Sequence, residues 1–167
     1  MTQTIERTTL SNLVFNEEYC RKVLPFIKSD YFDIKEEQVV FNEIVNFVDK
    51  YKRIPTQISL EIEVESRKDL TEDQHKNIVE IIKTLDSTEV DMEWLVDTTE
   101  KFCKDKAIYN AIVEGISIID GKDKNRGADA IPNILTDALA VCFDNAVGHD
   151  YFDDSEKRFD FYHRVEE

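Results

Sequence analysis

The chain has 167 residues, which is enough for one substantial core carrying an extension but too few for two independent domains of ordinary size. Its formal charge of −15 argues against strong nucleic-acid binding, because displacing the counterions of a phosphate backbone requires a basic surface. It contains only four glycines and three prolines, and apolar residues recur mostly at intervals of three and four, so we expect an all-α fold.

Three short or medium helices are predicted in the first 52 residues. The first begins at Thr8 or Thr9, either of which can cap it through its side-chain oxygen, and the second follows Asn16, whose side chain can cap it. The third, residues 34–52, is expected at the centre of the core. Its apolar stripe consists of Val40, Phe41, Ile44, Phe47, Val48 and Tyr51. Its polar face consists of Glu37, Glu43, Asn46 and Asp49.

Residues 58–65 alternate strictly between apolar and polar positions, which by periodicity alone indicates a strand. We predict a helix instead, because no second strand-like run is present to pair with a solitary strand. Thr71 and Gln74 then have the spacing of a capping box, which predicts a fifth helix over residues 72–85.

A long helix over residues 92–120 and a second apolar arm up to residue 146 are joined by the polar, glycine-rich segment 121–127. At about 1.5 Å per residue the long helix would span roughly 40 Å, more than the width of a small core. We therefore expect residues 1–91 to form a globular helical head. Residues 92–146 would form a protruding helical hairpin of the same domain, and residues 147–167 a linker that ends in an amphipathic helix.

Apolar residues lie on more than one side of each arm of this hairpin. Ile108 and Ile112 cannot face the same partner, and neither can Ile134 and Val141. Large aliphatic side chains left in water form an apolar surface that tends to associate with other proteins. We therefore expect self-association through the hairpin, with Ile108 in the interface. The alternative is that the rest of this chain covers these residues.

No motif in the sequence assigns a catalytic or metal-binding residue. The stretch from Gly115 to Lys122 is one residue too long for a phosphate-binding loop and lies within a predicted helix. His75, His149, Asp150 and Asp153 could hold a divalent metal that activates water, as in all-helical metal-dependent phosphohydrolases. A solvated acidic turn explains the last three better, so this enzyme is retained only as an alternative, beside a stand-alone acidic adaptor protein.

Four segments carry a resemblance to a known family. Residues 10–15, 19–32, 130–135 and 147–154 resemble, in this order, the amino-terminal part of the DnaB-like hexameric replicative DNA helicases of T-even-type bacteriophages. The resemblance implies a head, a hairpin that pairs subunits, and a linker to an ATPase motor. For the pairing role it gives Tyr109, Ile112, Ile116, Ile119, Ile134, Leu135, Ala138 and Leu139. For docking of the linker on a neighbouring motor we expect Tyr151, Phe152, Phe159 and Tyr162.

The same resemblance implies the partners and the location of the protein. Paired heads would form a collar on a hexamer built as a trimer of dimers, through which primase and a helicase loader are engaged. ATP and Mg²⁺ would act in the motor of the parent enzyme, for which this chain has no motif, so we expect no cofactor and no catalysis in these residues. Cys20, Cys103 and Cys142 are expected to be reduced, and no leader or bilayer-length apolar run is evident. We therefore expect the protein in the cytoplasm of the host cell.

Overall fold

The computed structural model of the protein describes residues 4–143. Over these residues every regular element is helical, so the predicted all-α class is confirmed. The α-helices are α1 (Ile5–Phe15), α2 (Glu17–Val23), α3 (Lys35–Tyr51), α4 (Gln57–Glu65), α5 (Glu72–Thr84), α6 (Met92–Ile119) and α7 (Ile131–Leu139). Short 3-10 turns occur at Leu24–Phe26, Ser29–Tyr31 and Ala128–Ala130.

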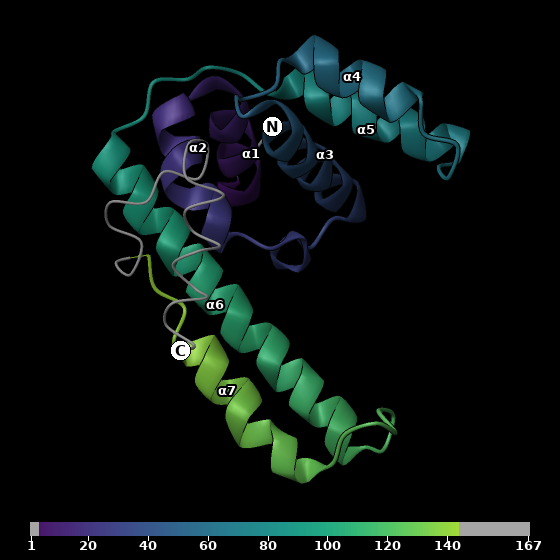
Figure 1. The fold of residues 1–167 in the computed structure, drawn as a ribbon, viewed down its shortest axis with the longest axis vertical. Coiled ribbons are helices and arrows are strands. Elements are labelled where there is room, and N and C mark those ends of the chain that lie inside the picture. Colours follow the sequence, from purple (N-terminus) through teal and green to yellow (C-terminus); the bar gives the residue numbers. More distant parts are fainter. Residues whose placement is uncertain (1–3, 144–167) are drawn as a thin grey trace.

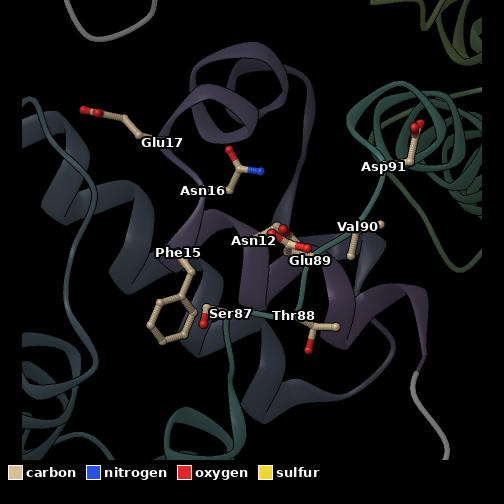
Figure 2. Close-up of a pocket in the computed structure, with 9 residues that line it drawn as sticks. All are labelled: Asn12, Phe15, Asn16, Glu17, Ser87, Thr88, Glu89, Val90 and Asp91. Carbon is tan, nitrogen blue, oxygen red and sulfur yellow. The ribbon is translucent and has the colours of Figure 1, made fainter.

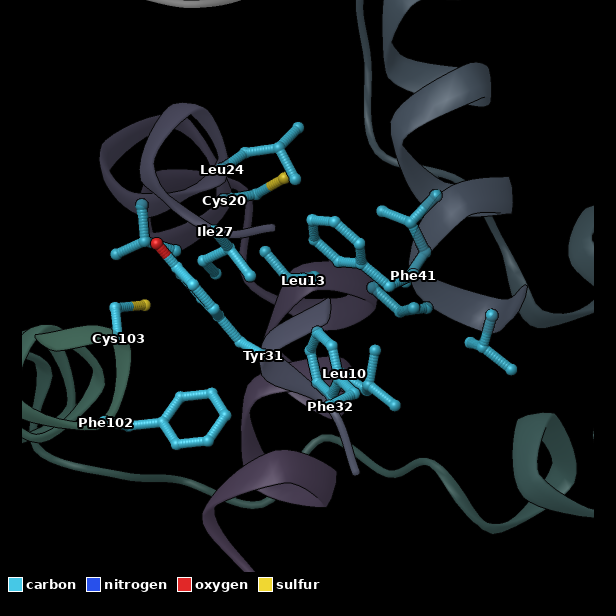
Figure 3. Close-up of a cluster of buried hydrophobic side chains, with 14 of the residues drawn as sticks. Leu10, Leu13, Cys20, Leu24, Ile27, Tyr31, Phe32, Phe41, Phe102 and Cys103 are labelled. Atoms are coloured by element: carbon cyan, nitrogen blue, oxygen red, sulfur yellow. The ribbon is translucent and has the colours of Figure 1, made fainter. Parts of the chain in front are cut away.

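Helices α1 to α5 and the first half of α6 form a head around one hydrophobic core (Figure 1). The Phe32 ring lies at its centre, with ring centroids 5.3 Å from Phe41 and 6.1 Å from Phe102 (Figure 3). The hydroxyls of Tyr19 and Thr99 share a buried 2.6 Å hydrogen bond that joins α2 to α6. The root of α6 is therefore part of the head.

Side-chain caps fix most of the helix starts, as the sequence predicts. Asn16 accepts a hydrogen bond from the Tyr19 N–H at 3.1 Å, and Thr56 and Thr71 both form complete capping boxes. The predicted cap of α1 at Thr8 or Thr9 is wrong. Thr4 caps this helix instead, and Thr9 is buried one turn later.

Glu37 does not lie on a solvent-facing polar side of α3, contrary to the prediction. Its side chain is only 2% exposed and accepts a hydrogen bond from Arg7 Nε at 3.0 Å. Arg7 also donates to the hydroxyl of Thr84 at 3.2 Å, so one guanidinium links α1, α3 and the end of α5. Burial raises the pKa of Glu37 above its usual value, although the Arg7 charge and hydrogen bond oppose that shift.

The alternating segment forms helix α4, as predicted, and its structure explains the alternation. Leu60 and Val64 are fully buried on one side of α4, whereas Ile58 and Ile62 are exposed on the other side. Residues four apart lie on the same face of a helix. The buried pair and the exposed pair are offset by two residues, so together they give apolar residues at every second position, as in a strand. The alternation therefore records a helix with apolar residues on two faces.

Helix α6 leaves the head and forms the protruding hairpin with α7, which returns along it (Figure 1). The second arm is shorter than predicted, because α7 ends at Leu139. Beyond that point the Phe143 ring stacks on Phe26 at 4.8 Å, and its backbone N–H donates to the Glu100 carboxylate at 3.1 Å. These contacts draw the chain out of the helix and onto the head. Residues 144–146 and the predicted linker 147–167 lie outside the described residues.

None of the helices in residues 4–143 has both the length and the apolar character needed to cross a bilayer.

Candidate subunit interface on the helical hairpin

Small residues line the side of α6 that faces α7. Ala107, Ala111 and Gly115 are buried at intervals of four residues, and Ala138 of α7 is 8% exposed. A Cβ placed on Gly115 would lie 3.6 Å from Cγ2 of Ile131, which is an ordinary van der Waals contact. The two arms therefore pack closely through small side chains, and the bulky residues of α6 are left to other faces.

Because of the packing at Gly115, we expect two substitutions at this residue to change the free energy of unfolding in opposite directions. Gly115→Ala should stabilise the chain by about 0.5–1 kcal/mol. The added methyl group fits beside Ile131, and alanine lowers the conformational entropy of the unfolded chain. Gly115→Leu should destabilise it by about 1–3 kcal/mol through overpacking against α7. Urea denaturation at one fixed protein concentration measures both changes. A destabilising Gly115→Ala would contradict the packing described.

The opposite side of α6 carries a continuous apolar strip that no described residue covers. We call this strip the outer stripe; it consists of Tyr109, Ile112, Val113, Ile116 and Ile119. Their exposed fractions range from 46% at Val113 to 71% at Ile119. Intervals of three and four residues place them on one face of the helix. Contiguous exposed apolar faces of this kind are typical of interaction surfaces, so the outer stripe is a candidate for one.

The predicted interface residues fall into three groups in the structure. Tyr109, Ile112, Ile116 and Ile119 belong to the outer stripe, and Leu139 of α7 is likewise exposed, at 68%. Ile108, Ile134 and Leu135 are half-buried against the core of their own chain. Ala138 is buried between the two arms. The predicted interface lacks Val113, although its helical spacing from Tyr109 and Ile116 places it on the same face.

Ion pairs fix the hairpin at both of its ends. Lys106 Nζ lies 2.6 Å from the Asp33 carboxylate, and the Asn110 side chain donates to the Asp30 carbonyl at 3.2 Å, which braces α6 against the head. At the tip, Arg126 pairs with Glu114 and with Asp123, the latter at 2.7 Å. The Arg126 hydrogen bond lowers the pKa of Asp123 below its usual value. These contacts hold α6, and with it the outer stripe, in a fixed position relative to the head and the hairpin tip.

A cavity on the head, away from the hairpin tip, has a different character. It measures about 630 Å³ and lies between the α1–α2 turn and the segment that precedes α6 (Figure 2). Two of its polar side chains are helix caps: Asn16 accepts from the Tyr19 N–H, and Asp91 accepts from the Trp94 N–H at 2.8 Å. The other charged lining residues are Glu17 and Glu89. The two capping roles are structural.

The residues of the alternative metal site are only partly described. His75 lies half-buried on α5, whereas His149, Asp150 and Asp153 fall outside the described residues. Within residues 4–143 no three His, Cys, Asp or Glu side chains are grouped to hold a metal ion.

Comparison with known proteins identifies the class to which this helical head and hairpin belong. Residues 1–95, more than half of the chain, match the family described as the DnaB-like helicase N terminal domain. The chain therefore belongs to the DnaB-like helicase N-terminal domain family, as the sequence resemblance predicts.

A particular relative extends the match into the hairpin. The chain is 32% identical over 158 residues to a protein of Enterobacteria phage T4 named "DnaB-like replicative helicase". The match covers 90% of this chain and 33% of the phage protein, so the chain spans about a third of the length of that curated relative.

Proposed function

We propose that this chain is the collar domain of a ring-shaped replicative DNA helicase, and that it pairs subunits through the outer stripe and Leu139. The observation that carries the proposal is the exposure of five large apolar side chains on one face of α6, on the side away from the small residues that pack on α7. Because all five lie on a single helix, two copies can bring the same face together about a twofold axis. The stripe then becomes the core of a dimer interface.

The free energy of the proposed contact follows from the apolar side chains it would bury. Burying a large apolar side chain completely contributes about 1.5–3 kcal/mol, so about ten half-exposed side chains from two copies give on the order of 10 kcal/mol. Association itself costs about 4–15 kcal/mol. The isolated domains should therefore pair weakly to moderately, and closure of a hexamer should need additional contacts from the rest of the helicase.

The proposed role in the replisome is assembly and docking. The paired heads would engage primase, and a helicase loader in addition, while ATP and Mg²⁺ act in the motor of the helicase. The linker residues Tyr151, Phe152, Phe159 and Tyr162 would dock on a neighbouring motor. This division of labour assigns no catalytic step and no cofactor to the present residues, and it places the protein in the cytoplasm of the host cell.

Sedimentation velocity and light scattering over a concentration series test the pairing. We expect a reversible monomer–dimer equilibrium whose dimer fraction rises between about 1 and 500 µM, because the expected interface energy corresponds to a micromolar or weaker Kd. A chain that stays monomeric at the highest concentration would refute the proposal.

A further inference from the structure

A second exposed apolar surface lies on the head, far from the outer stripe. It consists of Ile58 and Ile62, one turn apart on α4 and exposed to 69% and 60%; we call it the α4 ridge. Helices α4 and α5 lie on the side of the head away from α7 and the hairpin tip (Figure 1). The α4 ridge therefore remains accessible when two copies pair through their hairpins.

The support under the α4 ridge is firmly held. Leu60 and Val64 are fully buried on the inner face of α4. The Gln57 side-chain amide donates to the carbonyls of Ile82 and Leu85, at 2.9 and 2.8 Å, which fastens the start of α4 to the end of α5. A ligand that binds the ridge would meet a preformed surface and would not have to order it.

Carboxylates border the α4 ridge. Helical spacing places Glu61 three residues from Ile58 and Glu65 three residues from Ile62, next to the ridge, whereas Glu63 lies about 100° further round the helix. In the part of the chain that the structure describes, no lysine or arginine forms an ion pair with these three carboxylates. Glu43 of the same head, in contrast, pairs with Arg67 at 3.1 Å. The border of the ridge thus carries negative charge that a ligand can neutralise.

We propose that the α4 ridge docks a basic amphipathic helix of another replication protein, with apolar side chains on Ile58 and Ile62 and lysines or arginines against Glu61 and Glu65. This inference rests on the proposed docking role of the collar and assigns a surface to it. A second copy of α4 fits the ridge poorly, because twofold pairing would bring acidic residues opposite acidic residues. Charge complementarity therefore selects a different, basic partner.

Titration of the ¹⁵N-labelled chain with a helical 16-residue peptide tests the proposal. The peptide carries leucine along one face and lysine elsewhere, and a matched peptide carries glutamate at every lysine position. We expect the lysine peptide to shift amide signals of residues 57–66 more than those of residues 109–119, and the glutamate peptide to shift neither set. Shifts centred on the outer stripe, or equal shifts with both peptides, would overturn the assignment.

Surface variants sharpen the test. Ile58→Ser combined with Ile62→Ser, and separately Glu61→Lys combined with Glu65→Lys, should each raise the Kd of the lysine peptide at least tenfold. The matched pair Glu93→Lys and Asp97→Lys makes the same charge change four residues apart on α6, and it should alter that Kd less than threefold. If both charge-changed chains bind alike, only the net charge matters and the proposed site is wrong.

Failure of this inference is distinguishable from failure of the proposed function. The Ile58→Ser, Ile62→Ser chain should dimerise like the unmodified chain in sedimentation velocity, since its hairpin is untouched. A chain that dimerises but shows no peptide binding on α4 would refute the docking site and leave the pairing role intact.

Discussion

Ile116→Asp is expected to convert the protein into a folded monomer. Ile116 lies within the outer stripe and is 52% exposed, so the aspartate can remain hydrated in the monomer and leave the fold intact. In a twofold dimer two such carboxylates would be brought close together and partly buried in an apolar interface. The resulting cost of about 3 kcal/mol or more corresponds to at least about a hundredfold increase in Kd.

Sedimentation velocity at a concentration where the unmodified chain is mostly dimeric measures this effect, and circular dichroism checks the fold. Ile62→Asp is a matched control, because Ile62 is an isoleucine of similar exposure that lies on α4, outside the hairpin. It should leave dimerisation unchanged. Equal dimer fractions for Ile116→Asp and the unmodified chain would show that the outer stripe does not pair subunits.

Arg7→Met is expected to destabilise the head by about 3 kcal/mol or more at neutral pH. The substitution keeps much of the apolar stem of Arg7 but leaves the Glu37 carboxylate, which is 2% exposed, without its cation. Urea denaturation at pH 7 gives the change in the free energy of unfolding. Lys22→Met is the control, because it removes an exposed pair with Glu18 and should cost at most about 1 kcal/mol.

The pH dependence of the Arg7→Met effect has a defined sign. The folded-state pKa of Glu37 is already raised by burial, and loss of Arg7 should raise it further. A carboxyl group with a raised pKa contributes most to stability below its ordinary value, and that contribution is lost as the pH rises through the raised value. Relative to the unmodified chain, Arg7→Met should therefore be less destabilising at pH 4 than at pH 7. Adding Glu37→Gln should recover part of the loss at pH 7, and a pH-independent loss would contradict this explanation.

The local parts of the fold could be predicted from sequence because their signals are local. The caps at Asn16 and Thr71 depend on residues three positions apart, and the periodicity of α5 and α6 extends over several turns. For α4, a helix is predicted because the sequence offers no partner strand, and this reason involves the whole chain rather than the local pattern. The structure confirms the helix, and its apolar residues on two faces explain why the local pattern alone indicates a strand.

The differences from prediction arise from contacts between distant residues. Glu37 has the spacing of a polar-face residue, and only the approach of Arg7 from α1 makes its burial possible. Phe143 continues the helical pattern of α7, but its stacking on Phe26 draws it away. In the hairpin, apolar periodicity predicts more apolar residues than one face can bury but does not decide which faces lie inside. The buried Ala138 therefore falls among the predicted interface residues together with exposed ones.

Helix α6 is one unbroken rod of 28 residues, and its two ends belong to different parts of the molecule. Thr99 and Phe102 root it in the head, whereas Ile116 and Ile119 present the outer stripe near the tip. About 20 residues, or roughly 30 Å of helix, separate root from tip, so a 10° turn of the head would swing the tip by on the order of 5 Å. If two chains pair through the outer stripe as proposed, a protein that tilts the head would therefore also move the paired surfaces, because α6 is a continuous helix that need not unwind.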